Sequence, residues 1–140
     1  LRARYDYVFT SGGIGPTHDD ITAESIADAF GVALNLDPRA VAIMEPHYPP
    51  GQFTPARQRM ARIPEGADLI ENKASKAPGF RIENVHVMAG VPSIMQAMMD
   101  ALAPSLKTGK KMLSETVAAL SDLEVVQSIN SVLRMEGTTE

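Results

Sequence analysis

Short apolar runs alternate with helix-type patterns along much of the chain. The run 5–9 has the length and the aromatic and β-branched content of a buried strand, and residues 21–30 follow it with the spacing of a helix. Two further apolar runs, 80–82 and 85–88, flank Glu83-Asn84 and predict a β-hairpin. Strands that alternate with helices in this way are typical of α/β proteins.

Capping residues mark where the helices are expected to begin and end. Asp20 or Thr22 can cap a helix that ends just before Gly31. Asp37 and Thr54 each precede a proline, which is the order of an N-cap followed by the first helical position. A helix is therefore predicted after each of these caps.

A further helix is predicted to begin at Pro92. Its apolar side chains fall on one face and are Ile94, Met95, Met98, Met99 and Leu102. A stripe of flexible methionines at helical spacing fills a core more often than it binds a ligand. We expect this helix to pack against the sheet.

The loop over residues 10–22 is the strongest candidate for a functional site. It lies between the first strand and the first helix, and its three glycines allow a ligand to approach the main chain closely. Free backbone N–H groups in such a loop bind anions, usually phosphates. The polar residues of the loop are Ser11, Thr17, His18, Asp19, Asp20 and Thr22.

The residues of this loop can form a ligand site or can serve only the local structure, and both interpretations remain open. The glycines Gly12, Gly13 and Gly15 can serve only a tight turn between strand and helix. Asp19 and Asp20 can hold Mg²⁺ together with substrate phosphates, or one can cap the helix while the other binds the loop backbone. If Asp20 caps the helix, Asp19 is the stronger metal ligand. No role is assigned to His47 or His86.

The same loop resembles the signature of a known family. The pattern Thr-Ser-Gly-Gly-x-Gly-Pro-Thr-x-Asp-Asp-x-Thr, read at 10–22, is similar to that of the molybdopterin-binding domain shared by MoaB, MogA and MoeA. The version Gly-Pro-Thr-His-Asp-Asp at 15–20 most resembles the N-terminal domain of the CinA subfamily, the competence/damage-inducible proteins.

Three other segments support the resemblance. Residues 59–67 resemble a stretch of the subfamily that contains Pro-x-Gly-Ala. Asn72 with 77–80 resembles its Asn-x-x-Gly-Thr-Ala-Pro-Gly segment, although Ser75-Lys76 replaces Gly-Thr. Residues 89–92 read Ala-Gly-Val-Pro and are similar to a Pro-Gly-Val-Pro loop that supplies Gly90 and Pro92.

The resemblance implies an α/β fold with three layers and a doubly wound, mostly parallel sheet. Family members carry further strands and helices before the glycine loop, so the chain is expected to lack the first part of the domain. Residues 1–108 are then a partial molybdopterin-binding domain. Residues 109–140 would begin a small C-terminal α+β unit, in which 112–120 fits a strand or a helix and 121–124 is a capping box.

The resemblance also implies a function. The ligand would be molybdopterin or a nucleotide that carries phosphate, and CinA-like members would hydrolyse the pyrophosphate bond of ADP-ribose with a metal such as Mg²⁺. Asp19 and Asp20 are the expected catalytic and metal-binding residues. The expected ligand-binding residues are Ser11, Gly12, Gly13, Gly15, Thr17, His18, Thr22, Gly90 and Pro92. The alternatives are a non-catalytic module that binds a pterin or a protein, and an inactive fragment.

Composition narrows the class of protein further. The 140 residues include no cysteine, which excludes disulfides and cysteine nucleophiles and fits a cytoplasmic protein. A net charge of −4 argues against a nucleic-acid surface, and no apolar run approaches the ~20 residues of a membrane span. A sheet with unpaired edges is expected to associate with itself, so a homo-oligomer is predicted.

Overall fold

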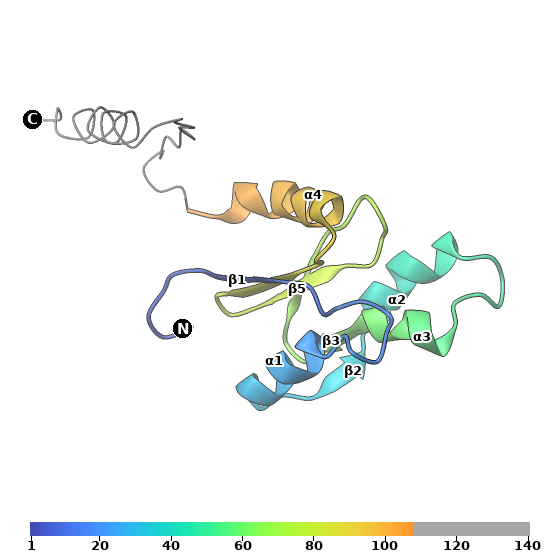
Figure 1. Ribbon diagram of the computed structural model, residues 1–140, viewed down its shortest axis with the longest axis horizontal. Helices are drawn as coiled ribbons and strands as arrows, with labels where there is room; N and C mark the ends of the chain where they lie inside the picture. The colour runs from blue at the N-terminus through green and yellow to red at the C-terminus, as the bar shows by residue number, and fades with distance from the viewer. Residues whose placement is uncertain (108–140) are drawn as a thin grey trace, which may run out of the picture. The chain divides into compact units, whose positions relative to one another are not determined.

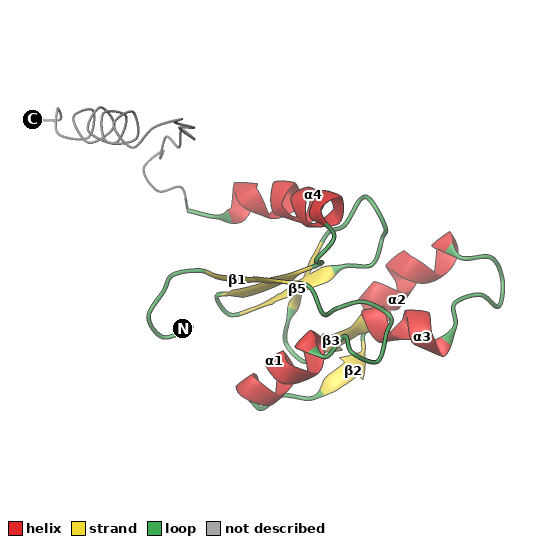
Figure 2. Ribbon diagram, in the orientation of Figure 1, coloured by secondary structure: helices red, strands yellow, loops and turns green. Residues whose placement is uncertain are grey.

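The computed structural model describes residues 1–107, and residues 1–106 form one compact unit. The predictions made for 109–140 lie outside the described residues. The longer elements are β1 (Val8–Ser11), α1 (Thr22–Phe30), α2 (Pro38–Met44), α3 (Pro55–Gln58), β5 (Gly79–Ile82), β6 (Val85–Met88) and α4 (Pro92–Leu102) (Figure 2). The three-residue strands are β2 (Leu34–Leu36), β3 (Arg62–Pro64) and β4 (Asp68–Ile70).

Within the described residues, the main sheet has four strands in the order β1-β6-β5-β4, and β2 pairs with β3 in a separate two-stranded sheet. In the main sheet β1 and β6 run parallel, whereas β6 with β5 and β5 with β4 are antiparallel. The α/β class is confirmed, but the described strands form a mixed sheet where a mostly parallel one was expected. The reason is local: a two-residue turn, Glu83-Asn84, joins β5 to β6, and such a turn permits only antiparallel pairing.

Helices cover both faces of the main sheet, which gives three layers. Figure 1 shows α4 on one side of the sheet and α1 on the other. Because successive side chains of a strand point to opposite faces of the sheet, a hydrophobic core forms on each face. On the α1 face, Phe80, Val85 and Val87 pack with residues of α1 and α2. On the α4 face, Met88 and Ile70 pack against Met98 and Leu102, so the predicted role of the methionine stripe is confirmed.

The helix caps agree with the sequence at three positions and differ at one. Asp37 accepts a hydrogen bond from the N–H of Arg39 at 2.8 Å, and Thr54 is the N-cap of α3, as predicted. Gly31 ends α1 with φ near 66°. At the start of α1 the N-cap is Ile21, with no side-chain cap bond. The prediction that Asp20 or Thr22 caps this helix is therefore wrong.

Among the described residues, no helix is long and apolar enough to cross a membrane. The edge strand β1 pairs with β6 on one side, and its other side pairs with no strand of residues 1–107. An unpaired edge of this kind is a template for association. Self-association of the chain stays a prediction.

One buried histidine is expected to make stability depend on pH. His86 in β6 is 1% exposed, and its ring lies 5.0 Å from that of Phe9 and 5.9 Å from that of Tyr7. Its Nδ1 contacts the carbonyl of Asn84, whereas Nε2 has no hydrogen-bond partner among residues 1–107. Burial lowers the pKa of His86 from its ordinary value of 6.5, and the charge of Arg81, paired across the sheet, acts in the same direction.

Because the folded pKa of His86 is lowered, the unfolded chain binds the proton first as the pH falls. The free energy of unfolding is expected to decrease once the pH drops below 6.5, by at most about 1.4 kcal/mol per pH unit. Urea denaturation at a series of pH values measures this slope. His86→Leu should flatten the slope between about pH 7 and 5. An unchanged slope in this variant would show that other groups cause it.

Candidate functional site

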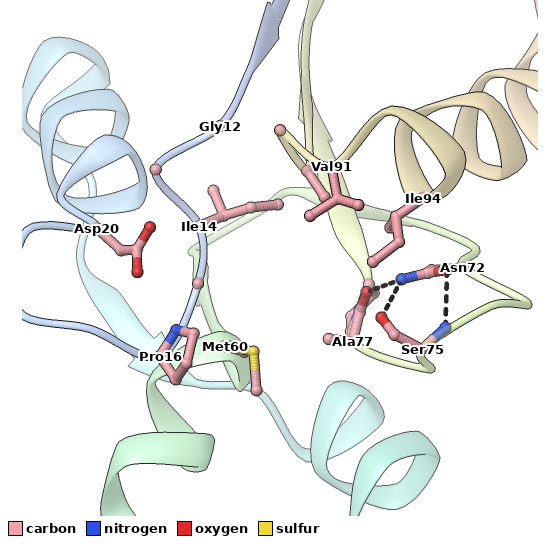
Figure 3. Close-up of a pocket in the computed structure, with 15 residues that line it drawn as sticks. Gly12, Ile14, Pro16, Asp20, Met60, Asn72, Ser75, Ala77, Val91 and Ile94 are labelled. Carbon is pink, nitrogen blue, oxygen red and sulfur yellow. Dashed lines mark hydrogen bonds between the residues drawn. The ribbon is translucent and has the colours of Figure 1, made fainter.

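A cavity of about 500 Å³ lies at the carboxyl ends of β1 and β6. In α/β sheets, ligands bind in crevices outside this end of the strands. The loop after β1 forms one wall, and the loops after β4 and β6, together with Met60 from the segment before β3, form the others (Figure 3). Its lining residues are Gly12, Gly13, Ile14, Gly15, Pro16, Asp20, Met60, Asn72, Ser75, Ala77, Pro78, Ala89, Gly90, Val91 and Ile94.

The glycine wall, made of residues 12–15 after β1 and of Gly90 after β6, depends on backbone conformations that only glycine adopts easily. Gly12 and Gly13 have φ of 90° and 69°. A Cβ at Gly13 would overlap the side-chain oxygen of Thr22, and a Cβ at Gly90 would lie 3.0 Å from the Cα of Gly12. The loops after β1 and β6 therefore meet main chain to main chain, because neither carries a side chain there.

Backbone donors remain available in this wall. The N–H of Gly12 donates to the carbonyl of Met88 at 2.9 Å, and the N–H of Thr22 donates to that of Gly13 at 2.9 Å. The N–H groups of Gly13 and Ile14 donate no hydrogen bond to any residue from 1 to 107. An anion in the cavity can accept from donors of this kind.

Asp20 is the carboxylate of the cavity. Its Oδ2 accepts hydrogen bonds from the N–H of Thr17 at 2.9 Å and from the Thr17 hydroxyl at 2.5 Å. The hydroxyl bond is the main reason why the pKa of Asp20 is lowered, and Arg59 adds a favourable charge. Asp20 is consequently ionised at neutral pH.

Asp19 points elsewhere. Its side chain is 76% exposed and its Oδ1 lies 3.1 Å from the Nδ1 of His18, whose side chain is 99% exposed. Neither residue lines the cavity. The two adjacent carboxylates therefore do not converge on one point. Within residues 1–107 no group of three acidic or histidine side chains is placed to hold a metal ion.

The structure brings five of the predicted site residues to the cavity: Gly12, Gly13, Gly15, Asp20 and Gly90. Ser11, Thr17, His18, Asp19, Thr22 and Pro92 do not line it. The Thr17 hydroxyl donates a hydrogen bond to the Asp20 carboxylate, the Thr22 side chain lies beside Gly13, and Pro92 is the first residue of α4. Their predicted contacts with a ligand remain predictions.

Several lining residues were not predicted to be part of the site. Met60, Asn72, Ser75, Ala77 and Ile94 come from segments distant from the glycine loop in the sequence. The signal that could have found most of them is the family resemblance at 59–67 and at 72–80. Those segments converge on the same cavity as 10–22 and 89–92.

A small ion cluster lies beside the cavity wall. Glu24 in the first turn of α1 pairs with Arg62 and, at 3.4 Å, with Arg59. Met60, the neighbour of Arg59, lines the cavity. The cluster ties α1 to Arg59 and to Arg62, the first residue of β3, which lie on either side of Met60 in the chain.

Known proteins resemble this chain in sequence and in structure. Protein TV0584 of Thermoplasma volcanium is 38% identical over 107 residues, which are 74% of this chain and 42% of that protein. A CinA-like protein of Anaeromyxobacter sp. (strain Fw109-5) is 41% identical over 103 residues, 69% of this chain and 25% of that protein. The chain thus spans less than half the length of either relative.

A solved structure agrees with the fold. The crystal structure of the protein CinA with unknown function from Thermoplasma acidophilum superposes with a TM-score of 0.66 at 36% identity, over 74% of this chain and 64% of that one. The family described as "Probable molybdopterin binding domain" matches residues 1–108. The expected relationship is confirmed, and the chain belongs to the molybdopterin-binding domain family, with CinA-like proteins among its relatives.

Proposed function

We propose that the chain binds a phosphate-bearing pterin or nucleotide in the cavity at the ends of β1 and β6. The observation that carries this proposal is the glycine wall. Gly12 and Gly13 hold left-handed conformations, Gly90 leaves the approach open, and the N–H groups of Gly13 and Ile14 have no partner within residues 1–107. A phosphate would accept these hydrogen bonds without meeting a side chain.

The remaining walls suit the rest of such a ligand. Ile14, Met60, Val91 and Ile94 present apolar side chains to the cavity. Small-molecule sites are commonly apolar with a few placed polar groups. Titration calorimetry with ADP-ribose tests the proposal, with inorganic pyrophosphate as the probe for the phosphate part alone. Saturable binding of both compounds is expected. If either compound gave only heats of dilution, the result would contradict the proposal.

A second candidate function, hydrolysis of the pyrophosphate bond, is favoured by the position of Asp20. Water would attack one phosphorus atom of ADP-ribose, and the bridging P–O bond would break to release AMP and ribose 5-phosphate. Asp20 is ionised and lines the cavity beside the glycine wall. A Mg²⁺ ion held there and by the phosphates would neutralise charge on the phosphate oxygens.

The residues present fit such an ion only in part. Among residues 1–107, Asp20 is the single carboxylate that lines the cavity, and its Oδ2 already accepts hydrogen bonds from Thr17. Mg²⁺ keeps several waters and needs only one or two carboxylates when phosphates share it. Metal binding is therefore expected to depend on the ligand.

Asp20→Asn and Asp19→Asn separate the two carboxylates. Since Asp20 lines the cavity and Asp19 does not, Asp20→Asn should abolish ligand-dependent Mg²⁺ binding and any release of AMP. Asp19→Asn should retain both to within about twofold, because its carboxylate faces solvent. Mg²⁺ titrations with and without ADP-ribose, together with a chromatographic assay for AMP, measure these effects. Equal losses in both variants would contradict the account in which only one of the two carboxylates binds the metal. No loss in either variant would remove the metal from the proposal.

A further inference from the structure

The cavity has two chemically different sides. In Figure 3 the glycine loop and Asp20 lie on one side, the loop that carries Asn72, Ser75 and Ala77 lies on the other, and apolar side chains stand between them. A ligand whose phosphate meets the glycine wall would therefore present its remaining part to the Asn72 loop.

Asn72 itself has no hydrogen-bonding capacity left for a ligand. Its amide nitrogen donates to the Ser75 hydroxyl at 2.6 Å and to the carbonyl of Ala77 at 2.8 Å. Its Oδ1 accepts from the N–H groups of Ala74 at 3.0 Å and of Ser75 at 3.2 Å. Two donors and two acceptor sites complete the inventory of an amide. Asn72, 3% exposed, thus holds the loop in shape.

Ser75 is left with a free donor. Its oxygen accepts from Asn72, and its O–H donates to no residue from 1 to 107. Because a hydroxyl has one donor in addition to its acceptor lone pairs, the bond from Asn72 fixes the oxygen and leaves the proton for another partner. In Figure 3 the Ser75 oxygen lies on the cavity side of its loop. Ser75 also stands where the family segment given above has glycine.

We infer that the Ser75 hydroxyl selects the ring of the bound ligand by donating a hydrogen bond to an acceptor on the ring edge. This inference rests on the proposed binding function. The ring would be a flat heteroaromatic one, because Ile14, Met60 and Ile94 offer apolar contact while Ser75 offers one donor. A ring nitrogen or a ring carbonyl oxygen meets this requirement, as in a purine or a pterin.

The test compares ADP-ribose with ribose 5-phosphate, which has no ring base, by titration calorimetry. Ser75→Ala should weaken ADP-ribose binding roughly 2- to 12-fold, the range of one net hydrogen bond, and leave ribose 5-phosphate binding unchanged. Ser75→Thr keeps the hydroxyl and should bind ADP-ribose within about twofold of the original chain. An equal loss for both ligands, or no loss for either, would overturn the inference.

A second measurement needs no variant of the protein. ADP-ribose analogues with carbon in place of N1, N3 or N7 of the adenine each lack one acceptor. One analogue should bind roughly 2- to 12-fold more weakly than ADP-ribose, and the others about equally. Equal affinity for all of them would overturn the inference while leaving the proposed function intact. Absence of ADP-ribose binding by the original chain would instead overturn the proposed function, and this inference with it.

Discussion

Replacing Gly13 with valine is expected to abolish binding of ADP-ribose. Gly13 has φ near 69°, a region that a β-branched residue occupies only under strain. Its new Cβ would also overlap the Thr22 side chain, and the carbonyl of Gly13 accepts the bond from the N–H of Thr22. The loop would have to move away from the start of α1. Its N–H groups would then no longer present the same set of donors to a phosphate.

Gly31→Val is the matched control. Gly31 also has positive φ, near 66°, but a Cβ there meets no atom of residues 1–107 within 4 Å, and the residue does not line the cavity. Both variants carry a similar backbone penalty from positive φ, so a loss of binding in Gly13→Val alone cannot be ascribed to that penalty. Calorimetry with ADP-ribose measures the affinity, and a thermal melt shows that each variant is folded. Unchanged affinity in folded Gly13→Val would refute the glycine wall as the binding element.

Replacing Gly79 with alanine is expected to cause a large loss of stability. Gly79 opens β5, and a Cβ there would overlap the carbonyl oxygen of Val87 and lie 3.3 Å from the sulfur of Met98. The oxygen belongs to β6, which is held between β1 and β5 and cannot retreat. We expect the free energy of unfolding to decrease by about 3 kcal/mol, the upper end of usual overpacking costs.

Gly66→Ala provides the comparison. Gly66 has φ near 81°, and no atom of the described part of the chain lies within 4 Å of its Cβ position. Only the left-handed conformation therefore opposes the alanine, at about 1–2 kcal/mol. Urea denaturation of the two variants measures the difference. Equal losses would mean that the close approach of β5 to the next strand contributes nothing of its own.

Patterns within short stretches of the sequence predicted those helices and strands whose formation depends on neighbouring residues. The hairpin of β5 and β6 follows from two apolar runs around a two-residue turn, and α2 and α3 follow from a capping residue before proline. Where two local roles competed, the prediction was wrong. Asp20 can cap a helix in principle, but its carboxylate binds Thr17 instead, so α1 begins without a side-chain cap.

Long-range pairing decided what the sequence left unpredicted. The strands β2, β3 and β4 have three residues each, too few for a period to emerge. They exist because each pairs with another strand: β2 pairs with β3, as Leu34 does with Pro64, and β4 pairs with β5 across the loop 71–78.

In the site, too, some features followed from neighbouring residues and others depended on the folded structure. The glycines of residues 12–15 were identified by their spacing, but the choice of carboxylate depends on side-chain direction, which places Asp20 at the cavity and Asp19 in solvent. Ser75 could not be identified from its neighbours in the chain. Its place in the cavity depends on the bonds that Asn72 makes within the loop.

The central claim is that a phosphate-bearing ligand binds at the glycine wall, and the amide signals of the glycines test it most directly. In a heteronuclear NMR titration of the ¹⁵N-labelled chain with ADP-ribose, the amides of Gly12, Gly13, Gly15 and Gly90 should shift, because these four residues line the cavity. Those of Gly31, Gly51 and Gly66, which do not line it, should stay in place. Shifts confined to the second group, or no shift of any glycine at saturating ligand, would contradict the account.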